Sequence, residues 1–152
     1  MMRLGRAVAA GAAGALAYLV AQEADRRIVN PRSNDLVLIG GIFTASRSIA
    51  RGLLGFGLHV LGGVSLGLAF EMVVARHLCG PSWLRGIVMV QVESAMVFPA
   101  VLLFDRTHPA VKSGELAPLF RPVYFAQQAW RHLALGAVIG VLLGPDPGRG
   151  SR

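Results

Sequence analysis

Long apolar runs alternate with short polar segments along this chain, and four of the runs reach the length of a membrane span. They cover about residues 4–22, 52–75, 83–104 and 126–143. An α-helix rises about 1.5 Å per residue, so about 20 residues cross a hydrocarbon core of roughly 30 Å. The pattern therefore predicts an all-α integral membrane bundle of four transmembrane helices, formed by a single domain of residues 1–144.

The segments between the runs predict different connections. Residues 79–82, Cys-Gly-Pro-Ser, suit a tight turn, so the second and third helices should form an antiparallel hairpin. The stretch 36–50 begins with apolar residues but is too short to span, and it carries Arg47, which favours an interfacial helix. Residues 105–125 contain three prolines and predict an irregular loop, whereas residues 145–152 predict a disordered tail.

Charge supports the membrane interpretation. Charged residues make up only 15% of the chain, against about 25% in an average soluble domain. The net charge of +7 comes from basic residues at the ends of apolar runs, where they meet lipid headgroups, so we expect no nucleic-acid partner. Nine basic residues, Arg131 included, belong to the two long loops, and six belong to the termini and the short turn. The positive-inside rule therefore favours cytoplasmic long loops in a multi-pass protein of the cell's inner (plasma) membrane.

The first apolar run has two interpretations. Arg3 and Arg6 precede it, as in a signal peptide. A cleavage site after Ala21 or Ala24 would place Leu19 or Gln22 where a small residue is needed. We therefore expect a retained first helix.

Two parts of the chain resemble each other. His59, Gly63 and Gly67 follow the pattern His-x-x-x-Gly-x-x-x-Gly, as do His132, Gly136 and Gly140. An Asp-Arg pair comes before each pattern, as Asp25-Arg26 and as Asp105-Arg106. The order predicts a repeat of two helix pairs, related by a twofold axis along the membrane normal. Chance is the alternative, because glycine is abundant in this chain.

Small residues four apart allow helix backbones to approach closely in lipid. This spacing predicts helix-packing positions at Gly55, Gly63, Gly67, Gly136 and Gly140. The alternative is that these glycines make room for a flat cofactor.

Polar residues at membrane depth are the candidates for chemistry, because a central charge costs about 2.5–3.5 kcal/mol on insertion scales. Glu93 lies in the middle of the third run and is either a proton or cation site or a neutral acid bonded to a neighbouring helix. His59 and His132 should lie at matched depth, where they would either ligate a haem b iron axially or form interhelical hydrogen bonds. The Asp-Arg pairs are candidates for helix-end ion pairs, but their recurrence predicts instead a paired structural feature on the face of the long loops. A carboxylate metal site from Glu23, Asp25 and Asp105 is a further alternative.

The last helix carries Arg-His-Leu-x-x-Gly-x-x-x-Gly from Arg131 to Gly140. In this it resembles small multi-pass bacterial membrane proteins known only as domains of unknown function, and the resemblance implies no activity. The motifs of phosphate-binding loops, serine hydrolases and zinc proteases are absent from the sequence. We therefore expect a non-enzymatic accessory or scaffold subunit that packs through its glycine faces.

Its expected partners are the lipid bilayer and either other membrane subunits or further copies of the chain. Two alternatives stay open. One is a protein that binds haem b or a pigment through the paired histidines. The other is a small proton- or ion-coupled carrier that uses Glu93.

Overall fold

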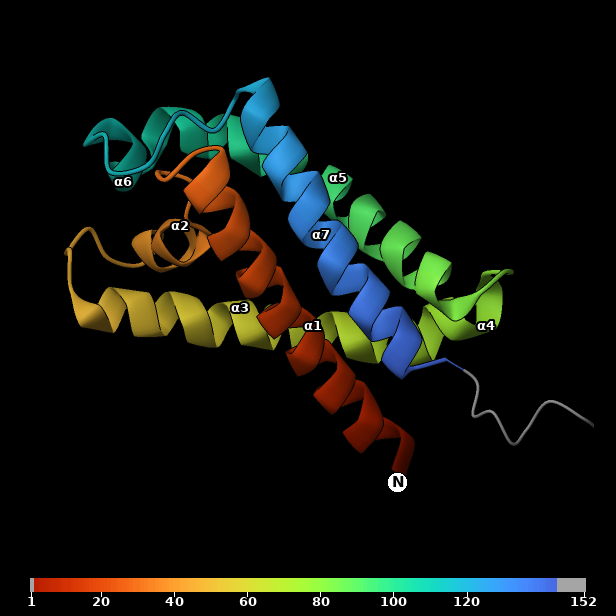
Figure 1. Cartoon of the computed structure of the whole chain (residues 1–152). Coiled ribbons are helices and arrows are strands. Elements are labelled where there is room, and N and C mark those ends of the chain that lie inside the picture. The colour runs from red at the N-terminus through yellow and green to blue at the C-terminus, as the bar shows by residue number, and fades with distance from the viewer. Residues whose placement is uncertain (1, 145–152) are drawn as a thin grey trace, which may run out of the picture.

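Helices form every regular element in the part of the chain that the computed structural model describes, residues 2–144. The elements are α1 (Met2–Ile28), α2 (Asp35–Gly41), α3 (Ile49–Ala69), a π-helical turn η1 (Phe70–Val74), α4 (Ala75–His77), α5 (Ser82–Thr107), α6 (Pro109–Lys112) and α7 (Pro122–Leu142) (Figure 1). The all-α class predicted from the apolar runs is confirmed.

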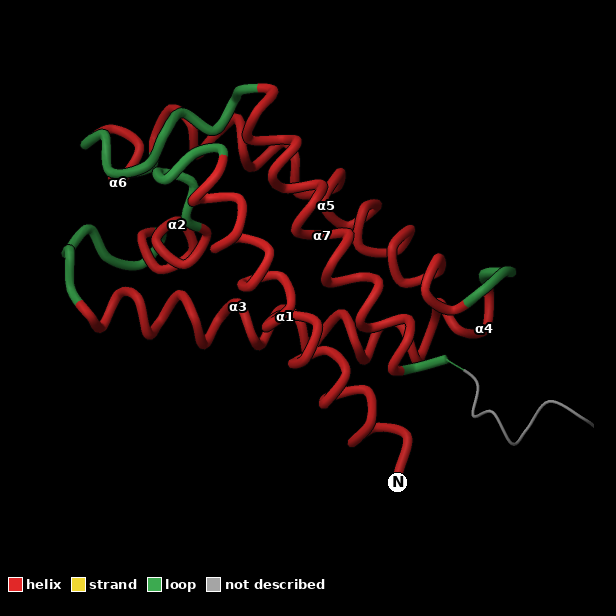
Figure 2. Tube along the Cα trace, in the orientation of Figure 1, coloured by secondary structure: helices red, strands yellow, loops and turns green. Residues whose placement is uncertain are grey.

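Two helix pairs make up the body of the molecule. The first consists of α1 and α3, the second of α5 and α7, and they join where α1 packs along α7. A short turn at Gly80, whose φ of 102° suits glycine, connects α4 to α5. From this turn α3 and α5 diverge, and α2 lies at the wide end between them (Figure 1). The loops gather at the ends of the long helices (Figure 2).

Glycine faces hold each pair together. A Cβ atom on Gly63 would lie 2.7 Å from both the Gly11 carbonyl oxygen and the Ala15 Cβ of α1, and one on Gly136 would lie 2.6 Å from the Gly86 carbonyl oxygen of α5. Gly67 and Gly140 likewise face the α1 and α5 backbones, and Gly55 faces the backbone of α2. The backbones therefore touch at positions where any larger residue would separate them.

The two pairs use equivalent positions. The α3 glycines meet Ala7 and Gly11 of α1, and the α7 glycines meet Ser82 and Gly86 of α5. Each α1 position lies 75 residues before its α5 counterpart (7 to 82 and 11 to 86). Both helix pairs thus cross through the same kind of small-residue contact.

Polar contacts tie the segment around α6 to α3 and to α2. Arg51 of α3 donates to both carboxylate oxygens of Glu115, in the loop after α6, with Nη1 3.1 Å from Oε2. His108, which caps α6, places Nε2 2.9 Å from the Leu38 carbonyl oxygen of α2. Burial lowers the pKa of His108, and the Arg51 guanidinium lowers it further.

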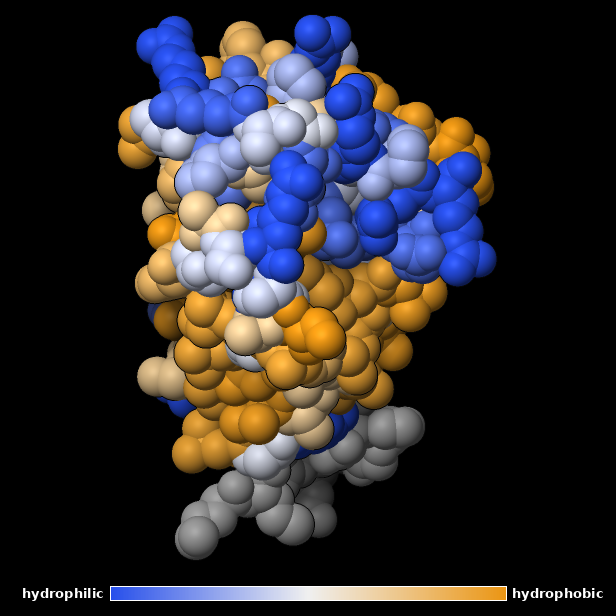
Figure 3. Space-filling view, turned by 90° about the vertical axis from the view of Figure 1, so that its left-hand side faces the viewer, coloured by the Kyte–Doolittle hydropathy of each residue, from blue (hydrophilic) through white to orange (hydrophobic). Residues whose placement is uncertain are grey.

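Three helical segments of the described chain are long and apolar enough to cross a membrane: Leu4–Ile28, Ile49–His77 and Ser82–Thr107. The 29 residues of the second would extend about 44 Å, more than a bilayer core, and such excess length is accommodated by tilt. On the face seen in Figure 3, hydrophilic residues cover the upper end and the surface beneath is mostly hydrophobic. This division suits a protein with one end in water and its body in lipid.

Several predicted boundaries need correction. The first helix was expected to end near residue 22, but it continues to Ile28, because Gln22 and Asp25 are bonded to other buried groups. The predicted interfacial segment 36–50 is helical only as α2, and α3 begins at Ile49 after the capping Ser48. The loop expected over residues 105–125 contains α6, and the predicted tail 145–152 lies outside the described residues.

Candidate functional site

A buried arginine joins the two helix pairs. Arg131 of α7 is fully buried, and its Nε and Nη2 donate to the two carboxylate oxygens of Asp25 in α1 at 2.7 and 2.5 Å. Its Nη1 donates to Asp35 at the start of α2 at 2.8 Å, and its Nη2 also donates to the Ser33 hydroxyl at 3.0 Å. One guanidinium thus ties together α1, α2 and α7, an arrangement that suits its fixed fork of donors.

The surrounding polar side chains complete this cluster. Gln127 donates to Asp25 at 2.5 Å, and the side-chain oxygen of Gln22 accepts from the Asp35 backbone N–H at 2.9 Å. We call this cluster the Arg131 network; it comprises Gln22, Asp25, Ser33, Asp35, Gln127 and Arg131. All six side chains are buried, so the network compensates charges that would otherwise be costly at this depth.

Tyr18 extends the network toward the middle of the molecule. Its hydroxyl donates to Asp35 and also lies 2.6 Å from the Gln128 side-chain oxygen. The Gln128 amide donates in turn to Asp35 at 2.9 Å. Tyr18 and Asp35 therefore form the boundary between the Arg131 network and the open space beside it.

That open space is a cleft of about 310 Å³ between the diverging α3 and α5. Its polar wall contains Tyr18, Asp35, His59, Glu93, Gln128 and His132. Its apolar walls come from α2, α3 and α5, for example at Ile39, Leu66 and Val97. We call it the α3–α5 cleft. It brings together Glu93, His59 and His132, the three polar residues singled out in the sequence.

Glu93 and His132 face each other across this cleft. His132 Nδ1 lies 2.7 Å from the Gln128 backbone carbonyl oxygen, which can only accept, so Nδ1 carries a proton. His132 Nε2 lies 3.8 Å from the Glu93 carboxylate. The lone pair of His132 Nε2 thus faces Glu93 from beyond hydrogen-bond distance, and the Glu93 side chain is 40% exposed.

His59 has a different neighbour. The Tyr18 ring centroid lies 4.8 Å from that of His59 and 5.1 Å from that of His132. His59 Nε2 lies 3.2 Å from the Ala15 carbonyl oxygen. The Nε2 atoms that would ligate a haem iron thus point to a carbonyl and to Glu93, so these residues do not fit the haem b interpretation.

No protein-family model, curated protein or solved structure matches this chain. The function must therefore be inferred from the residues of the chain itself.

The two Asp-Arg pairs do not have equivalent roles. Asp25 binds Arg131, and its neighbour Arg26 pairs with Glu23 at 3.2 Å. Asp105 accepts from the backbone N–H of Phe120 at 3.2 Å and also from that of Leu119, so it fixes the loop before α7. Asp25 and Asp105 therefore bind different kinds of partner, one a side-chain cation and the other the backbone of a loop. Among the described residues, no group of three or more His, Cys, Asp or Glu side chains could hold a metal ion.

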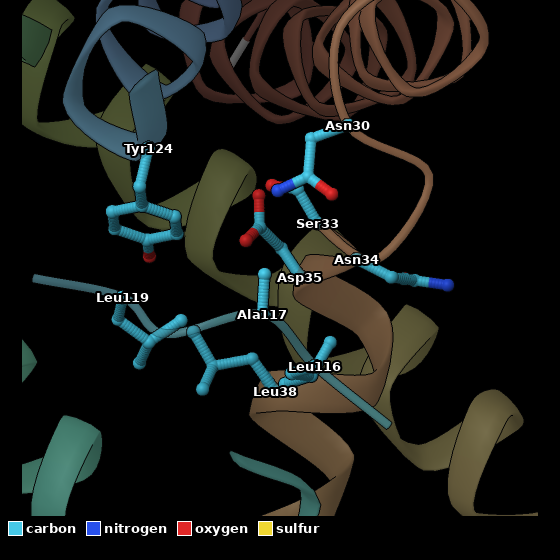
Figure 4. A pocket seen from close by; sticks show the side chains of 9 residues that line it. All are labelled: Asn30, Ser33, Asn34, Asp35, Leu38, Leu116, Ala117, Leu119 and Tyr124. Carbon is cyan, nitrogen blue, oxygen red and sulfur yellow. The ribbon is translucent and has the colours of Figure 1, made fainter. Parts of the chain in front are cut away.

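A second, enclosed cavity lies on the far side of Asp35, where Asn30 and Ser33 line it from above and Tyr124 from the side (Figure 4). Its volume of about 10 Å³ holds at most about one water molecule, so it is too small for a ligand.

Several site residues were missed from the sequence. Arg131 was assigned to the loop charges, although it lies inside α7 with no exposed surface. A helical signal was present, because Gln127 and Arg131 are four residues apart and share one face. Tyr18 gave no such signal, because its partners lie in other helices.

Proposed function

We propose that this chain is a four-crossing integral membrane protein of the plasma membrane that binds a small ligand in the α3–α5 cleft and catalyses no reaction. The α3–α5 cleft is the observation that carries the proposal. Ligand sites typically have volumes of about 300–1,000 Å³, apolar walls and a few convergent polar groups. The cleft has a volume of about 310 Å³, and polar residues from five helices line it together with apolar ones.

The fourth crossing is α7. This helix has 21 residues, enough for a span, but its apolar character is lowered by polar residues such as Gln127 and Arg131. Both are buried within the protein and do not face lipid. Four crossings place both termini on one side and the loops at Arg32 and Ser113 on the other. Both residues are exposed, so cysteines introduced at these two positions in a Cys79→Ser background should react with an impermeant thiol reagent from the same side of the membrane. Labelling from opposite sides would contradict the topology.

The glycine faces supply a scaffold within the chain. Gly63 and Gly136 each meet a helix backbone of the same molecule, so no partner subunit is needed to cover them. This favours a self-contained binding protein over an accessory subunit held by those faces. We further propose that the two helix pairs form an internal repeat, supported by the shared 75-residue spacing and weakened by the unlike Asp25 and Asp105.

Filling the cleft tests the ligand-binding proposal. Gly62 lines the cleft, and a Cβ there would meet no atom within 4 Å, so Gly62→Trp can occupy the space without displacing a backbone. Gly57 lies on the same helix, is equally open and does not line the cleft, so Gly57→Trp is the matched control.

Small molecules extracted from each purified protein should be compared by mass spectrometry. We expect a compound that accompanies the wild-type and Gly57→Trp proteins and is missing from Gly62→Trp. Identical extracts from all three proteins would contradict ligand binding in the cleft.

A second candidate is proton- or ion-coupled transport, which the Glu93–His132 geometry favours. An acid and a base 3.8 Å apart at the wall of an open cleft can exchange a proton with a passing solute. Purified protein in liposomes should then move protons together with a solute, and Glu93→Gln should abolish this movement. Wild-type flux no greater than that of protein-free liposomes, or equal flux in the wild type and Glu93→Gln, would exclude the carrier.

A further inference from the structure

We propose that the α3–α5 cleft selects an organic cation: an ammonium group attached to an apolar body. This inference rests on the proposed function, because it names the ligand class for the same cleft. It follows from the charges that line the cleft, from the fixed orientation of His132 and from the aromatic rings that line the same cleft.

The ionisable groups on the cleft wall are unbalanced in sign. The residues lining it include the carboxyl groups of Asp35 and Glu93, and no lysine or arginine is among them. Arg131 is fully buried behind Asp35, where its guanidinium is shared between two carboxylates. The formal charge of that cluster is therefore negative, and an anionic ligand would meet no cation in the cleft.

Glu93 is the carboxyl group best placed to receive a cation. Asp35 already accepts from Arg131, Tyr18 and Gln128, which leaves it little capacity for another donor. Among the residues that the structure describes, the Glu93 carboxylate has His132 as its side-chain neighbour, at 3.8 Å, and 40% of its side chain is exposed. A ligand cation could thus reach Glu93 without breaking a strong internal hydrogen bond.

His132 cannot replace a ligand cation as a permanent partner of Glu93. Its Nδ1 proton is held by the Gln128 carbonyl oxygen at 2.7 Å, so a neutral ring presents a lone pair to Glu93. Such a ring stabilises a carboxylate only after taking up a second proton. The cleft therefore contains an acid whose counter-ion is supplied either by a proton or by a bound cation.

The rest of the cleft suits the body of such a ligand. Rings of Tyr18, Phe104 and Tyr124 line it together with aliphatic residues of α2 and α5, among them Leu38 and Val101. Aromatic faces attract ammonium groups, most strongly where water is excluded. An ammonium with an apolar body would bury its apolar surface in the cleft and leave its charge beside Glu93.

The test uses two probes of the same shape and different charge. Benzyltrimethylammonium is a cation, and neopentylbenzene is its neutral isostere. Each is titrated against the full-length protein in nanodiscs of zwitterionic lipid, and the thermal unfolding midpoint is recorded. The Gly62→Trp protein serves as the blank, so partition of either probe into the lipid cancels.

The wild-type protein should bind the cation about tenfold or more tightly than the neutral isostere, chiefly because of the Glu93 carboxylate, with a smaller contribution from the aromatic rings that line the cleft. Glu93→Gln keeps the side-chain size and should remove most of this preference, whereas Glu93→Asp should retain part of it. Equal binding of the two probes, blocked by Gly62→Trp, would overturn the cation inference and leave the ligand cleft standing. If neither probe distinguishes the wild type from Gly62→Trp, both the inference and the proposed function are contradicted for ligands of this size.

Discussion

The two helix pairs cross in the same way, but the polar residues beside their histidines differ. In both, a histidine helix crosses its partner through glycines, and the histidine lies beside a residue seven positions after a crossing glycine of the partner helix. His59 contacts Tyr18, seven residues after Gly11, and His132 faces Glu93, seven residues after Gly86. Tyr18 and Glu93 are themselves 75 residues apart, the spacing of the glycine contacts. Tyr18 is buried and bonded to Asp35, whereas Glu93 is partly open to the cleft.

This difference separates two kinds of polar residue in one molecule: those that hold the helices together and those that are open to a ligand. The Arg131 network uses Tyr18 and Asp35 to join α1, α2 and α7, and every charge in it has an opposite charge nearby. In the second pair, Glu93 has His132 as its neighbour and is otherwise open to the cleft. A buried charge that already has a hydrogen-bonded partner of opposite charge holds the fold, whereas an acid without such a partner is available to a ligand.

The largest expected loss of stability comes from replacing Arg131, the centre of the Arg131 network. Arg131→Met would leave Asp25 and Asp35 buried without their cation, and breaking a buried ion pair in this way costs about 3–5 kcal/mol. We therefore expect a much lower thermal unfolding midpoint in detergent or poor accumulation in the membrane.

Arg27→Met is the matched control for this substitution. Arg27 also pairs with a carboxylate, Glu23, at 2.7 Å, but its side chain is 76% exposed. Exposed ion pairs contribute about 0–1 kcal/mol, so its loss should be nearly neutral. Equal midpoints for the two variants would show that the network does not hold the fold.

The next largest loss of stability should come from enlarging a crossing glycine, and it should be similar in the two helix pairs. Gly63→Leu and Gly136→Leu each introduce a side chain against a facing backbone, where even a Cβ would lie only 2.6–2.7 Å from the nearest atoms. Overpacking costs about 1–3 kcal/mol, and more where a backbone has to move. Both variants should lose thermal stability, whereas Gly57→Leu, with no atom near its Cβ, should not. A loss in only one of the two variants would show that the two crossings are not equivalent.

The smallest effect should be a pH dependence that originates at His108. Burial lowers the pKa of this histidine below the value near 6.5 that it has in an unfolded chain, so the unfolded state binds more protons in this range. The stability contributed by neutral His108 is therefore present above about pH 6.5 and is lost as the pH falls below it.

Thermal unfolding of the wild type and of His108→Asn should be compared between pH 7.5 and 5.5. Asparagine can still cap α6, so the fold should survive. The midpoint should fall with pH more steeply in the wild type, because other histidines titrate in both proteins. Parallel curves would mean that burial does not hold His108 neutral in the folded protein.

The sequence was sufficient for the helical class and for the membrane character, because both depend on local apolar length. It also identified Gly63 and Gly136 as helix-packing positions, because each lies four residues before another glycine and this spacing is a local property of one helix. It could not predict the Arg131 network, because Arg131 and Asp25 are 106 positions apart and meet only when α7 packs on α1. A hydropathy average also gives α7 too low an apolar score, because it counts polar residues that are buried within the protein in the same way as residues that face lipid.

The candidate site was predicted in part. Glu93, His59 and His132 were recognised as costly groups at membrane depth, and all three line the cleft. Their neighbours were not predictable, because the position of Tyr18 beside both histidines depends on the crossing of three helices. The unlike roles of Asp25 and Asp105 arise in the same way, from partners in distant segments.

The most direct test of the open cleft beside Glu93 compares two neighbouring residues of α5. Val97 lines the cleft, whereas Met96 does not, although Met96 is more exposed, at 76% against 47%. In a Cys79→Ser background, Val97→Cys and Met96→Cys should be treated with N-ethylmaleimide in nanodiscs. A thiol must ionise to react, which needs water, so Val97→Cys should react faster and Gly62→Trp should slow it. A faster reaction at Met96→Cys, or no reaction at Val97→Cys, would contradict an accessible cleft within the membrane.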